Sequence, residues 1–327
     1  MNKKHTGQKA VMLAVILLLV FVLVFSGLMV LGRLFWEDTA ASPGTHTSKT
    51  LIRGDKSYFP RQDITVLLLM GIDETGPVQS SDSYRNTGES DAVVLLILDE
   101  QDSTYSVLCL NRDTMLDMPV LGIGGKEAGT FYGQLALSHT YGTGLADSAE
   151  NTRKTVSDFL YGITIDHYVA VNMDAIAIAN DAVDGVTVNV TEDFSAADPT
   201  ITMGQVTLRG EQALNYVRTR KEVGDQLNLS RMQRHEQYMQ GFMTAFNAKL
   251  TQSDTFAVKL YEDITPYTVT DCSMNVLTGL MNRCSDYTLK EIVSPEGDNV
   301  LGEEHYEFYA DEEALDQLIL RLFYVEK

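Results

Sequence analysis

Residues 64–73 read ITVLLLMGID, a nearly unbroken apolar run that leads into Asp73. A run of this kind, without polar alternation, predicts a strand that is buried on both faces and that ends in a loop. Two further apolar runs, Ala92–Leu98 and Tyr105–Leu110, predict neighbouring strands joined by a polar turn. These three strands are the expected centre of the fold.

Helical and strand patterns alternate downstream of this centre. Helices are expected over Ala146–Leu160 and Asp174–Val183, and strands over His167–Val171 and Val186–Val190. Between residues 122 and 144, many glycines and little periodicity predict a long loop with a short helix near Leu135–Thr140. The alternation predicts an α/β fold in which helices cover a sheet.

The start of the chain predicts a membrane anchor. Three lysines precede Ala10–Gly32, which carries no charge and is long enough to cross a bilayer. The lysine bias predicts a single-pass type II protein, with residues 1–9 in the cytoplasm, residues 10–34 in the cell membrane and the rest extracytoplasmic. A cleaved signal peptide is the competing interpretation, although its apolar region is usually shorter. Residues 35–62 are expected to be a linker.

The composition argues against one class of partner. The 327 residues include 45 acidic and 25 basic side chains, which gives a formal net charge of -20. General nucleic-acid binding needs a broad cationic field, so we expect no nucleic-acid partner. The main folded domain is expected over residues 63–250. Residues 251–327 are acidic, contain only short apolar segments and are expected to be a C-terminal extension or small subdomain.

The three cysteines are too few for a disulfide scaffold. Cys109 lies within an apolar run, where a buried thiol is expected. Cys272 and Cys284 either pair in a disulfide or stay free, and the sequence leaves both alternatives open. No metal is assigned to any of the three thiols.

Residues 215–237 read NYVRTRKEVGDQLNLSRMQRHEQ and concentrate arginine in an otherwise acidic chain. The stretch contains four arginines: Arg218, Arg220, Arg231 and Arg234. A long helix is expected from beyond Asp225 to about Leu250, and its two arginines lie on a flank roughly 120° from the apolar stripe. Arginine forks suit phosphate, so the density favours an anionic ligand. A solvated helix face with weak surface ion pairs is the alternative, and spacing alone leaves both open.

Charged residues stand at the ends of the three central strands. Asp73 and the pair Arg112–Asp113 follow predicted strands, and Asp91 precedes one. In a mixed sheet these positions can meet at one edge, where α/β folds commonly bind ligands. Two carboxylates near arginines either form salt bridges or hold Mg²⁺ that is shared with a phosphate. Turn formation or capping is the simpler role for these aspartates, and the pattern leaves the choice open.

A series of motifs in one order resembles the LytR–CpsA–Psr family of membrane-anchored enzymes of the Gram-positive envelope. The motifs are VLLLMGID (66–73), SD (90–91), NRDT (111–114), DHYV (166–169), DGVTV (184–188), LRGEQ (208–212), YVRTR (216–220) and RMQR (231–234). The resemblance implies an α/β/α sandwich with a central mixed sheet. It also implies transfer of a glycopolymer, such as a teichoic acid or capsular polymer, from a polyprenyl-pyrophosphate carrier to peptidoglycan, with formation of a phosphodiester.

The same resemblance assigns roles to residues of this chain. Asp73 and Asp91 would hold Mg²⁺. Five arginines would bind the pyrophosphate: Arg112, Arg218, Arg220, Arg231 and Arg234. Asp113 and Asp225 would orient these arginines or the incoming hydroxyl, so the implied catalytic set is Arg112, Asp113, Arg218, Arg220 and Asp225. Transfer of this kind depends on positioning and on neutralising charge that develops on oxygen.

Three features depart from the family pattern. Glu89 stands where the family usually has arginine, and Arg85 in the preceding loop is a candidate to replace it in substrate binding. His235, which we also place in the substrate-binding set, stands where glutamine is common, and the interval from Asp225 to Arg231 is longer than usual. Two alternative functions therefore stay open. One is hydrolysis of the polyprenyl-pyrophosphate sugar, and the other is a non-catalytic, membrane-anchored protein that binds lipid or glycan.

Overall fold

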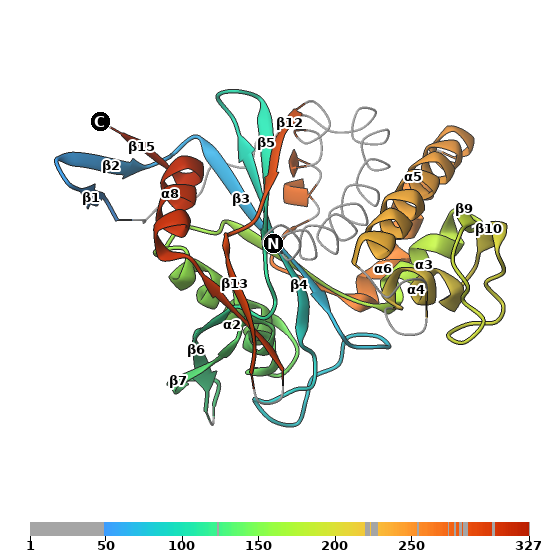
Figure 1. Cartoon of the computed structure of the whole chain (residues 1–327), viewed down its shortest axis with the longest axis horizontal. Helices are drawn as coiled ribbons and strands as arrows, with labels where there is room; N and C mark the ends of the chain where they lie inside the picture. Colours follow the sequence, from blue (N-terminus) through green and yellow to red (C-terminus); the bar gives the residue numbers. More distant parts are fainter. Residues whose placement is uncertain are drawn as a thin grey trace.

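A six-stranded mixed sheet forms the centre of the molecule (Figure 1). In spatial order its strands are β11 (Thr268–Thr270), β8 (His167–Asn172), β3 (Ile64–Ile72), β4 (Ser90–Asp99), β5 (Thr104–Leu110) and β12 (Thr288–Val293). β3, β4 and β5 pair antiparallel, as do β11 and β8, whereas β8 runs parallel to β3 and β12 parallel to β5. The predicted α/β fold with a central mixed sheet is confirmed.

The computed structural model describes residues 49–122, 124–219, 223, 228–253, 255–273, 275–277, 279–280, 283, 287–302 and 305–326. Several predicted features lie outside these residues: the anchor over residues 10–34, Arg220, Asp225 and Cys284. The side chains of Arg231 and His235 on α5 also lie outside what the structure describes. Among the helices of the described ranges, none combines the length and the apolar character needed to cross a bilayer.

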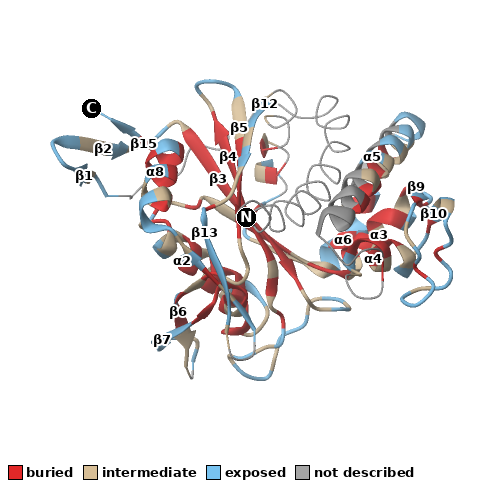
Figure 2. Ribbon diagram, viewed as in Figure 1, coloured by how far each residue is buried: buried red, intermediate tan, exposed pale blue. Residues whose placement is uncertain are grey.

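Side chains of β3 alternate between two hydrophobic cores. Leu67 and Leu69 belong to the core on one face, and Leu68 and Met70 to the core on the other. Residues of α3 (Asp174–Ala182), α4 (Glu211–Arg218), α5 (Asn228–Gln252) and α6 (Phe256–Ile264) complete the first core. Residues of η1 (Leu135–Thr140), α2 (Ala146–Phe159) and α8 (Glu312–Phe323) complete the second. Helices therefore cover both faces, and Figure 2 shows the buried residues gathered on the strands between them.

Within the described residues, three two-stranded antiparallel sheets lie outside the central sheet. They pair β6 (Met115–Leu121) with β7 (Glu127–Gln134), β9 (Val186–Val190) with β10 (Gly204–Leu208), and β13 (Gly297–Leu301) with β14 (Tyr306–Ala310). The prediction of a long loop between residues 122 and 144 is therefore wrong for the residues of β7. This strand is mostly exposed and contains two glycines, so it gives no apolar signal, and its pairing with β6 defines it.

The C-terminal segment is part of the fold instead of a separate extension. After η2 (Thr265–Tyr267), β11 and β12 occupy the two edges of the central sheet, and α8 packs into the second core. The last strand, β15 (Tyr324–Glu326), pairs with β2 (Lys56–Pro60), which pairs with β1 (Leu51–Arg53), as Figure 1 shows. Residues 51–60 thus form two paired strands, although they were predicted as linker. These strands are short and lack a clear apolar pattern, and the partner of β2 on its other side, β15, lies at the far end of the chain.

Candidate active site

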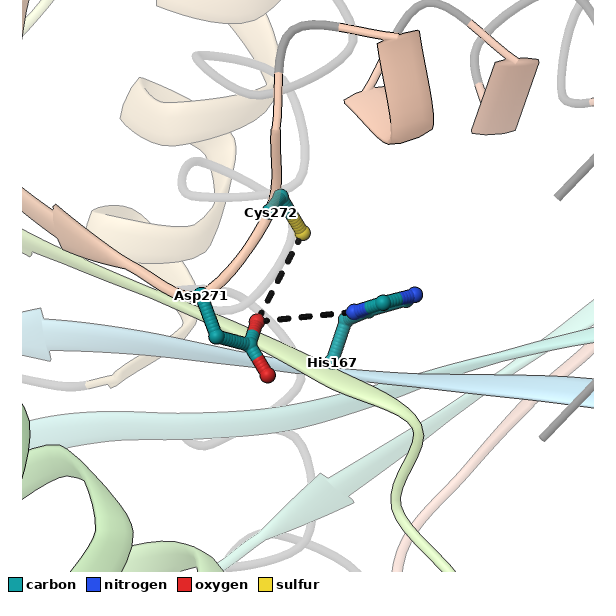
Figure 3. Close-up of side chains that lie close together, drawn as sticks. All are labelled: His167, Asp271 and Cys272. Carbon is teal, nitrogen blue, oxygen red and sulfur yellow. Dashed lines mark hydrogen bonds and ion pairs between the residues drawn. The ribbon is translucent and has the colours of Figure 1, made fainter. Parts of the chain in front are cut away.

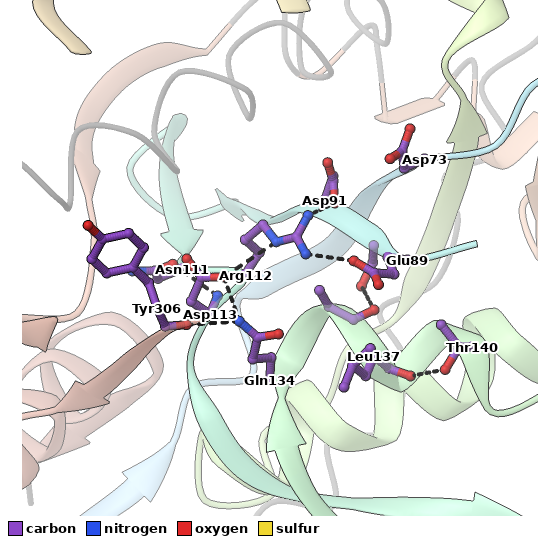
Figure 4. A network of polar contacts seen from close by, with 12 residues as sticks. Asp73, Glu89, Asp91, Asn111, Arg112, Asp113, Gln134, Leu137, Thr140 and Tyr306 are labelled. Atoms are coloured by element: carbon purple, nitrogen blue, oxygen red, sulfur yellow. Dashed lines mark hydrogen bonds and ion pairs between the residues drawn. The ribbon is translucent and has the colours of Figure 1, made fainter. Parts of the chain in front are cut away.

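The ends of β3, β4 and β5 bring the predicted metal ligands together. Gly71 pairs with Ala92 and Ile72 with Ser90, so Asp91 is the extra residue of a β-bulge. A bulge changes the direction of a side chain, and bulges are common beside active sites. The backbone N–H of Asp73 donates to the carbonyl of Glu89 at 2.9 Å, which holds the end of β3 against the start of β4. In Figure 4 the carboxylates of Asp73 and Asp91 point to the same side of these strand ends.

Arg112 follows β5 and lies among three carboxylates (Figure 4). Its guanidinium pairs with Asp91, with Glu89 at 2.6 Å and with Asp113 at 3.5 Å. The Arg112 side chain is 26% exposed, so a ligand can reach it from solvent. Three carboxylates against one guanidinium leave surplus negative charge, which favours a bound cation.

Asp113 is held from two hairpins. Gln134 on β7 donates from Nε2 to Oδ1 of Asp113 at 2.9 Å and to the carbonyl of Tyr306 at 2.9 Å. The backbone N–H of Phe308 on β14 donates to the carbonyl of Asp113 at 2.8 Å. The carboxylate therefore has a fixed orientation beside Arg112, as a residue that positions a reacting hydroxyl requires.

Arg218, the last residue of α4, reaches the site through Asp73. Its Nη2 lies 3.0 Å from Oδ1 of Asp73, and the Arg218 side chain is 53% exposed. The structure thus brings together six residues, which we call the strand-end cluster: Asp73, Glu89, Asp91, Arg112, Asp113 and Arg218. Five of these six were predicted as site residues, and Glu89 is the addition.

Arg234 lies elsewhere and is buried, with a side chain that is only 5% exposed. It donates to the carbonyls of Tyr216 and Thr219 at 2.9 Å each, and it pairs with Glu192 at 2.8 Å. Burial lowers the pKa of its guanidinium, with the Glu192 carboxylate acting in the opposite direction. Helical periodicity placed Arg234 on the flank of the helix, but it does not show that the segment carrying Glu192 covers that flank. Binding of the pyrophosphate by Arg234 stays a prediction.

Arg85 belongs to the loop between β3 and β4. Its guanidinium carbon lies 4.1 Å from the centre of the Tyr141 ring, a cation–π arrangement. Its backbone carbonyl accepts hydrogen bonds from the hydroxyls of Ser81 and Ser83. Tyr141 directly follows η1, so Arg85 is anchored beside that helix. Its replacement of the arginine expected at position 89 stays a prediction.

His139 orders the loop that carries Glu89, a role that no sequence pattern indicated. Its ring is buried, and Nδ1 lies 2.9 Å from the carbonyl of Gly88, to which it donates in the matching tautomer. Burial lowers the pKa of His139 to about 4, so the ring is neutral at pH 7. The Asn86 amide donates to the carbonyl of His139 at 2.8 Å and fixes the same loop from its other side.

The residues at the strand ends fit Mg²⁺ better than a softer metal. Asp73 and Asp91 supply carboxylate oxygens, the ligand type that Mg²⁺ prefers. Within the described ranges, the cluster contains no set of three metal-ligating side chains whose ligand atoms all lie within 4.8 Å. Two carboxylates suit an ion that completes its coordination with phosphate oxygens and water.

Fold and site together define a class of protein. A mixed sheet covered by helices on both faces presents arginines and acidic residues at one strand end, as expected of a protein that binds a phosphorylated ligand. The model of the LytR_cpsA_psr family matches residues 37–322. The chain belongs to this family, which confirms the resemblance inferred from its motifs.

A sequence relative agrees with this assignment, and two solved structures share the fold. The chain is 32% identical over 220 residues to the polyisoprenyl-teichoic acid–peptidoglycan teichoic acid transferase TagU of Enterococcus faecalis, with 66% of this chain and 64% of the relative covered. It resembles the structure of protein gbs0355 from Streptococcus agalactiae, with a TM-score of 0.60, 21% identity and coverage of 80% and 86%. It also resembles B. subtilis TagV, with a TM-score of 0.54, 23% identity and coverage of 80% and 96%. The two structures support the fold.

Proposed function

We propose that this chain transfers a phosphoglycan from a polyprenyl-pyrophosphate carrier to peptidoglycan on the extracytoplasmic side of the cell membrane. One observation carries the proposal: Arg112 and Arg218 stand beside Asp91 and Asp73 at the end of three neighbouring strands. Guanidinium groups next to paired carboxylates suit a pyrophosphate with a bound cation. The name of the Enterococcus faecalis relative, a teichoic acid transferase, supports the same reaction class.

In this reaction, the hydroxyl of the acceptor glycan attacks the phosphorus that carries the sugar. The new P–O bond forms the phosphodiester, the P–O bond to the second phosphate breaks, and polyprenyl phosphate leaves with that electron pair. The hydroxyl proton moves to a base, and Asp113 is the proposed base, since Gln134 fixes its carboxylate.

The arginines neutralise the charge that develops on the phosphate oxygens. Arg112 pairs with Asp91 and Arg218 pairs with Asp73, so two guanidinium groups stand beside the proposed position of the pyrophosphate. Before the substrate arrives, both are paired with carboxylates. Phosphate oxygens then replace carboxylate oxygens as partners, and neither guanidinium is left unpaired during binding. Arg220, Arg231, His235 and Asp225 stay proposed members of the site.

We propose Asp73 and Asp91 as the residues that hold Mg²⁺. When bound, the ion neutralises negative charge on the pyrophosphate. The Arg112–Asp91 pair limits how many oxygens Asp91 offers, which agrees with an ion that takes few protein ligands. The anchor predicted over residues 10–34 would hold this site at the membrane that contains the lipid carrier.

The test is a transfer assay with the full chain in detergent or lipid vesicles. A polyprenyl-pyrophosphate sugar, Mg²⁺ and peptidoglycan fragments are supplied, and products are identified by mass spectrometry. We expect glycan joined to peptidoglycan through a phosphodiester. Free phosphosugar in the presence of abundant acceptor would instead indicate hydrolysis, and tight lipid binding without turnover would indicate a binding protein.

Matched variants separate the site from general damage. Arg112→Ala removes the central guanidinium of the strand-end cluster. Arg53→Ala removes an arginine outside this cluster, which pairs with Asp316 on α8. We expect transfer to fall in the first variant and to stay unchanged in the second. Equal activity in both variants would contradict the proposed role of Arg112.

A further inference from the structure

Three side chains with nitrogen, oxygen and sulfur ligand atoms meet at the start of β8 (Figure 3). His167 is the first residue of β8, and Asp271 and Cys272 directly follow β11. β11 pairs antiparallel with β8, with Thr270 opposite Val169. Two further steps along this register place Cys272 opposite His167, so the pairing of the strands brings the three residues together.

The distances among these atoms match those of a metal site. Oδ1 of Asp271 lies 3.5 Å from Nδ1 of His167 and 3.7 Å from Sγ of Cys272, and all three ligand atoms lie within 4.8 Å of one another. Bonds of about 2.0–2.3 Å in a tetrahedral zinc site separate neighbouring ligand atoms by about 3.3–3.6 Å. Two of the three separations between ligand atoms are therefore close to those found around a bound zinc ion. Only small side-chain shifts are needed to complete the site.

Hydrogen bonding around the cluster also favours a metal. Nδ1 of His167 is buried, and among the described residues it has no well-aligned hydrogen-bond partner; its contact with Asp271 is a long one. The backbone N–H of Tyr168 donates to Oδ1 of Asp271 at 2.9 Å and orients the carboxylate, as partners of metal ligands commonly do. A cation between the three side chains would give the His167 nitrogen a closer partner than the Asp271 carboxylate at 3.5 Å.

We propose that His167, Asp271 and Cys272 bind one Zn²⁺ ion, with water at the fourth position. Imidazole, carboxylate and thiolate together suit zinc, whereas Mg²⁺ prefers oxygen ligands alone. The side chains of His167 and Asp271 are 25% and 27% exposed, which gives the ion a path from solvent. As the thiol binds, it loses its proton to solvent and the sulfur forms the bond to zinc.

This zinc site is distinct from the strand-end cluster. His167 pairs with Leu67 and Asn172 with Ile72, next to Asp73. Five residues of strand separate the two ends, which corresponds to about 17 Å at roughly 3.3 Å per residue. The ion would link the short edge strand β11 to β8, and thereby join the C-terminal part of the chain to the centre of the sheet.

Two other roles for Cys272 fit the structure less well. A disulfide with Cys284 is one; among the described residues Cys272 has a free thiol, and Cys284 lies outside them. A catalytic nucleophile is the other, but the Cys272 side chain is buried and its Sγ lies 3.7 Å from a carboxylate oxygen of Asp271, whereas reactive thiols lie in partly exposed, electropositive surroundings.

The test measures Zn²⁺ binding to the full chain in detergent, in competition with a chromophoric chelator and with Mg²⁺ in excess to occupy the strand-end cluster. We expect one zinc ion per chain. Cys272→Ser and His167→Gln should each weaken binding at least about tenfold. Cys109→Ser, which changes a buried thiol of the central strand β5, is the matched control and should bind as the parent does.

Cobalt provides a second measurement, and its first step uses only the parent chain. Co²⁺ alone, added to the parent chain, should produce a thiolate-to-cobalt charge-transfer band, and Zn²⁺ should remove it. The band should persist in Cys109→Ser and be absent in Cys272→Ser. A parent chain without the band, or zinc affinity that is equal in the parent and in both ligand variants, would overturn the proposal.

Discussion

Two arginines in this molecule show how the same side chain serves a site in one place and the fold in another. Arg112 in the strand-end cluster is partly exposed and faces three carboxylates, which leaves surplus negative charge that favours a bound cation. Arg234 belongs to what we call the helix-side cluster, with Glu192, Phe194 and Tyr216. It is buried, its guanidinium lies 5.1 Å from the Phe194 ring, and two of its bonds go to backbone carbonyls. The difference lies in exposure and in the type of partner.

The largest effect is expected in the helix-side cluster. Arg234→Ala should lower the free energy of unfolding by about 3–5 kcal/mol, because it leaves Glu192 buried without its partner. Urea unfolding of the purified chain measures this change. Arg53→Ala, which removes an arginine from an exposed ion pair, is the control. A loss below about 1 kcal/mol, the range of surface pairs, would show that the helix-side cluster is not structural.

The next effect concerns activity. Arg112→Ala should reduce kcat/KM for transfer by about 10²–10³-fold, or about 2.7–4 kcal/mol, the usual result of removing one donor that stabilises developing charge. Initial rates at several concentrations of lipid substrate provide the measurement. Arg112→Lys keeps the charge but loses the fork, so it should recover only part of the activity. Full activity in the lysine variant would show that charge alone matters.

Protonation of His139 at acid pH should lower the free energy of unfolding. The pKa of His139 in the folded state, about 4, lies below its usual value of 6.5. The contribution of the neutral His139 ring to the free energy of unfolding is therefore fully present above pH 6.5 and decreases as the pH falls toward 4. Between pH 7 and pH 5, protonation of this ring should lower the free energy of unfolding by about 2 kcal/mol. Urea unfolding at the two pH values measures it. His139→Asn keeps a donor for Gly88 without a titrating ring, and its unfolding should depend less on pH over the same interval.

The smallest effect is expected for Arg218, the exposed arginine of the strand-end cluster. Arg218→Ala should change the free energy of unfolding by less than about 1 kcal/mol, because its pair with Asp73 is exposed. Unfolding by urea, beside the Arg234→Ala variant, measures the contrast. A loss as large as that of Arg234→Ala would remove the distinction between the two clusters.

The sequence predicted the centre of the fold and most of the strand-end cluster. β3, β4 and β5 were recognised because strands that are buried on both faces are continuously apolar. Asp73, Asp91 and Arg112 were recognised because each stands next to such a run. Their meeting at one edge then followed from antiparallel pairing. Glu89 was noted as a departure from the family pattern, but its pairing with Arg112 was not foreseen.

Other features gave no local signal. Residues 51–60 and β7 are polar or glycine-containing strands whose identity depends on their partners. Arg234 was placed on the correct helix, but the residues that bury it come from a segment about forty positions earlier, and helical periodicity contains no information about that segment.

The sequence by itself therefore determined which segments are buried, since hydrophobic periodicity is a property of neighbouring residues. It also determined which charged residues stand at the ends of those segments. Only the tertiary structure decided which distant groups meet: Arg112 with Glu89, Arg234 with Glu192, and His167 with Asp271 and Cys272. The physical reason is that strand register and helix packing set these contacts, and both depend on the whole chain.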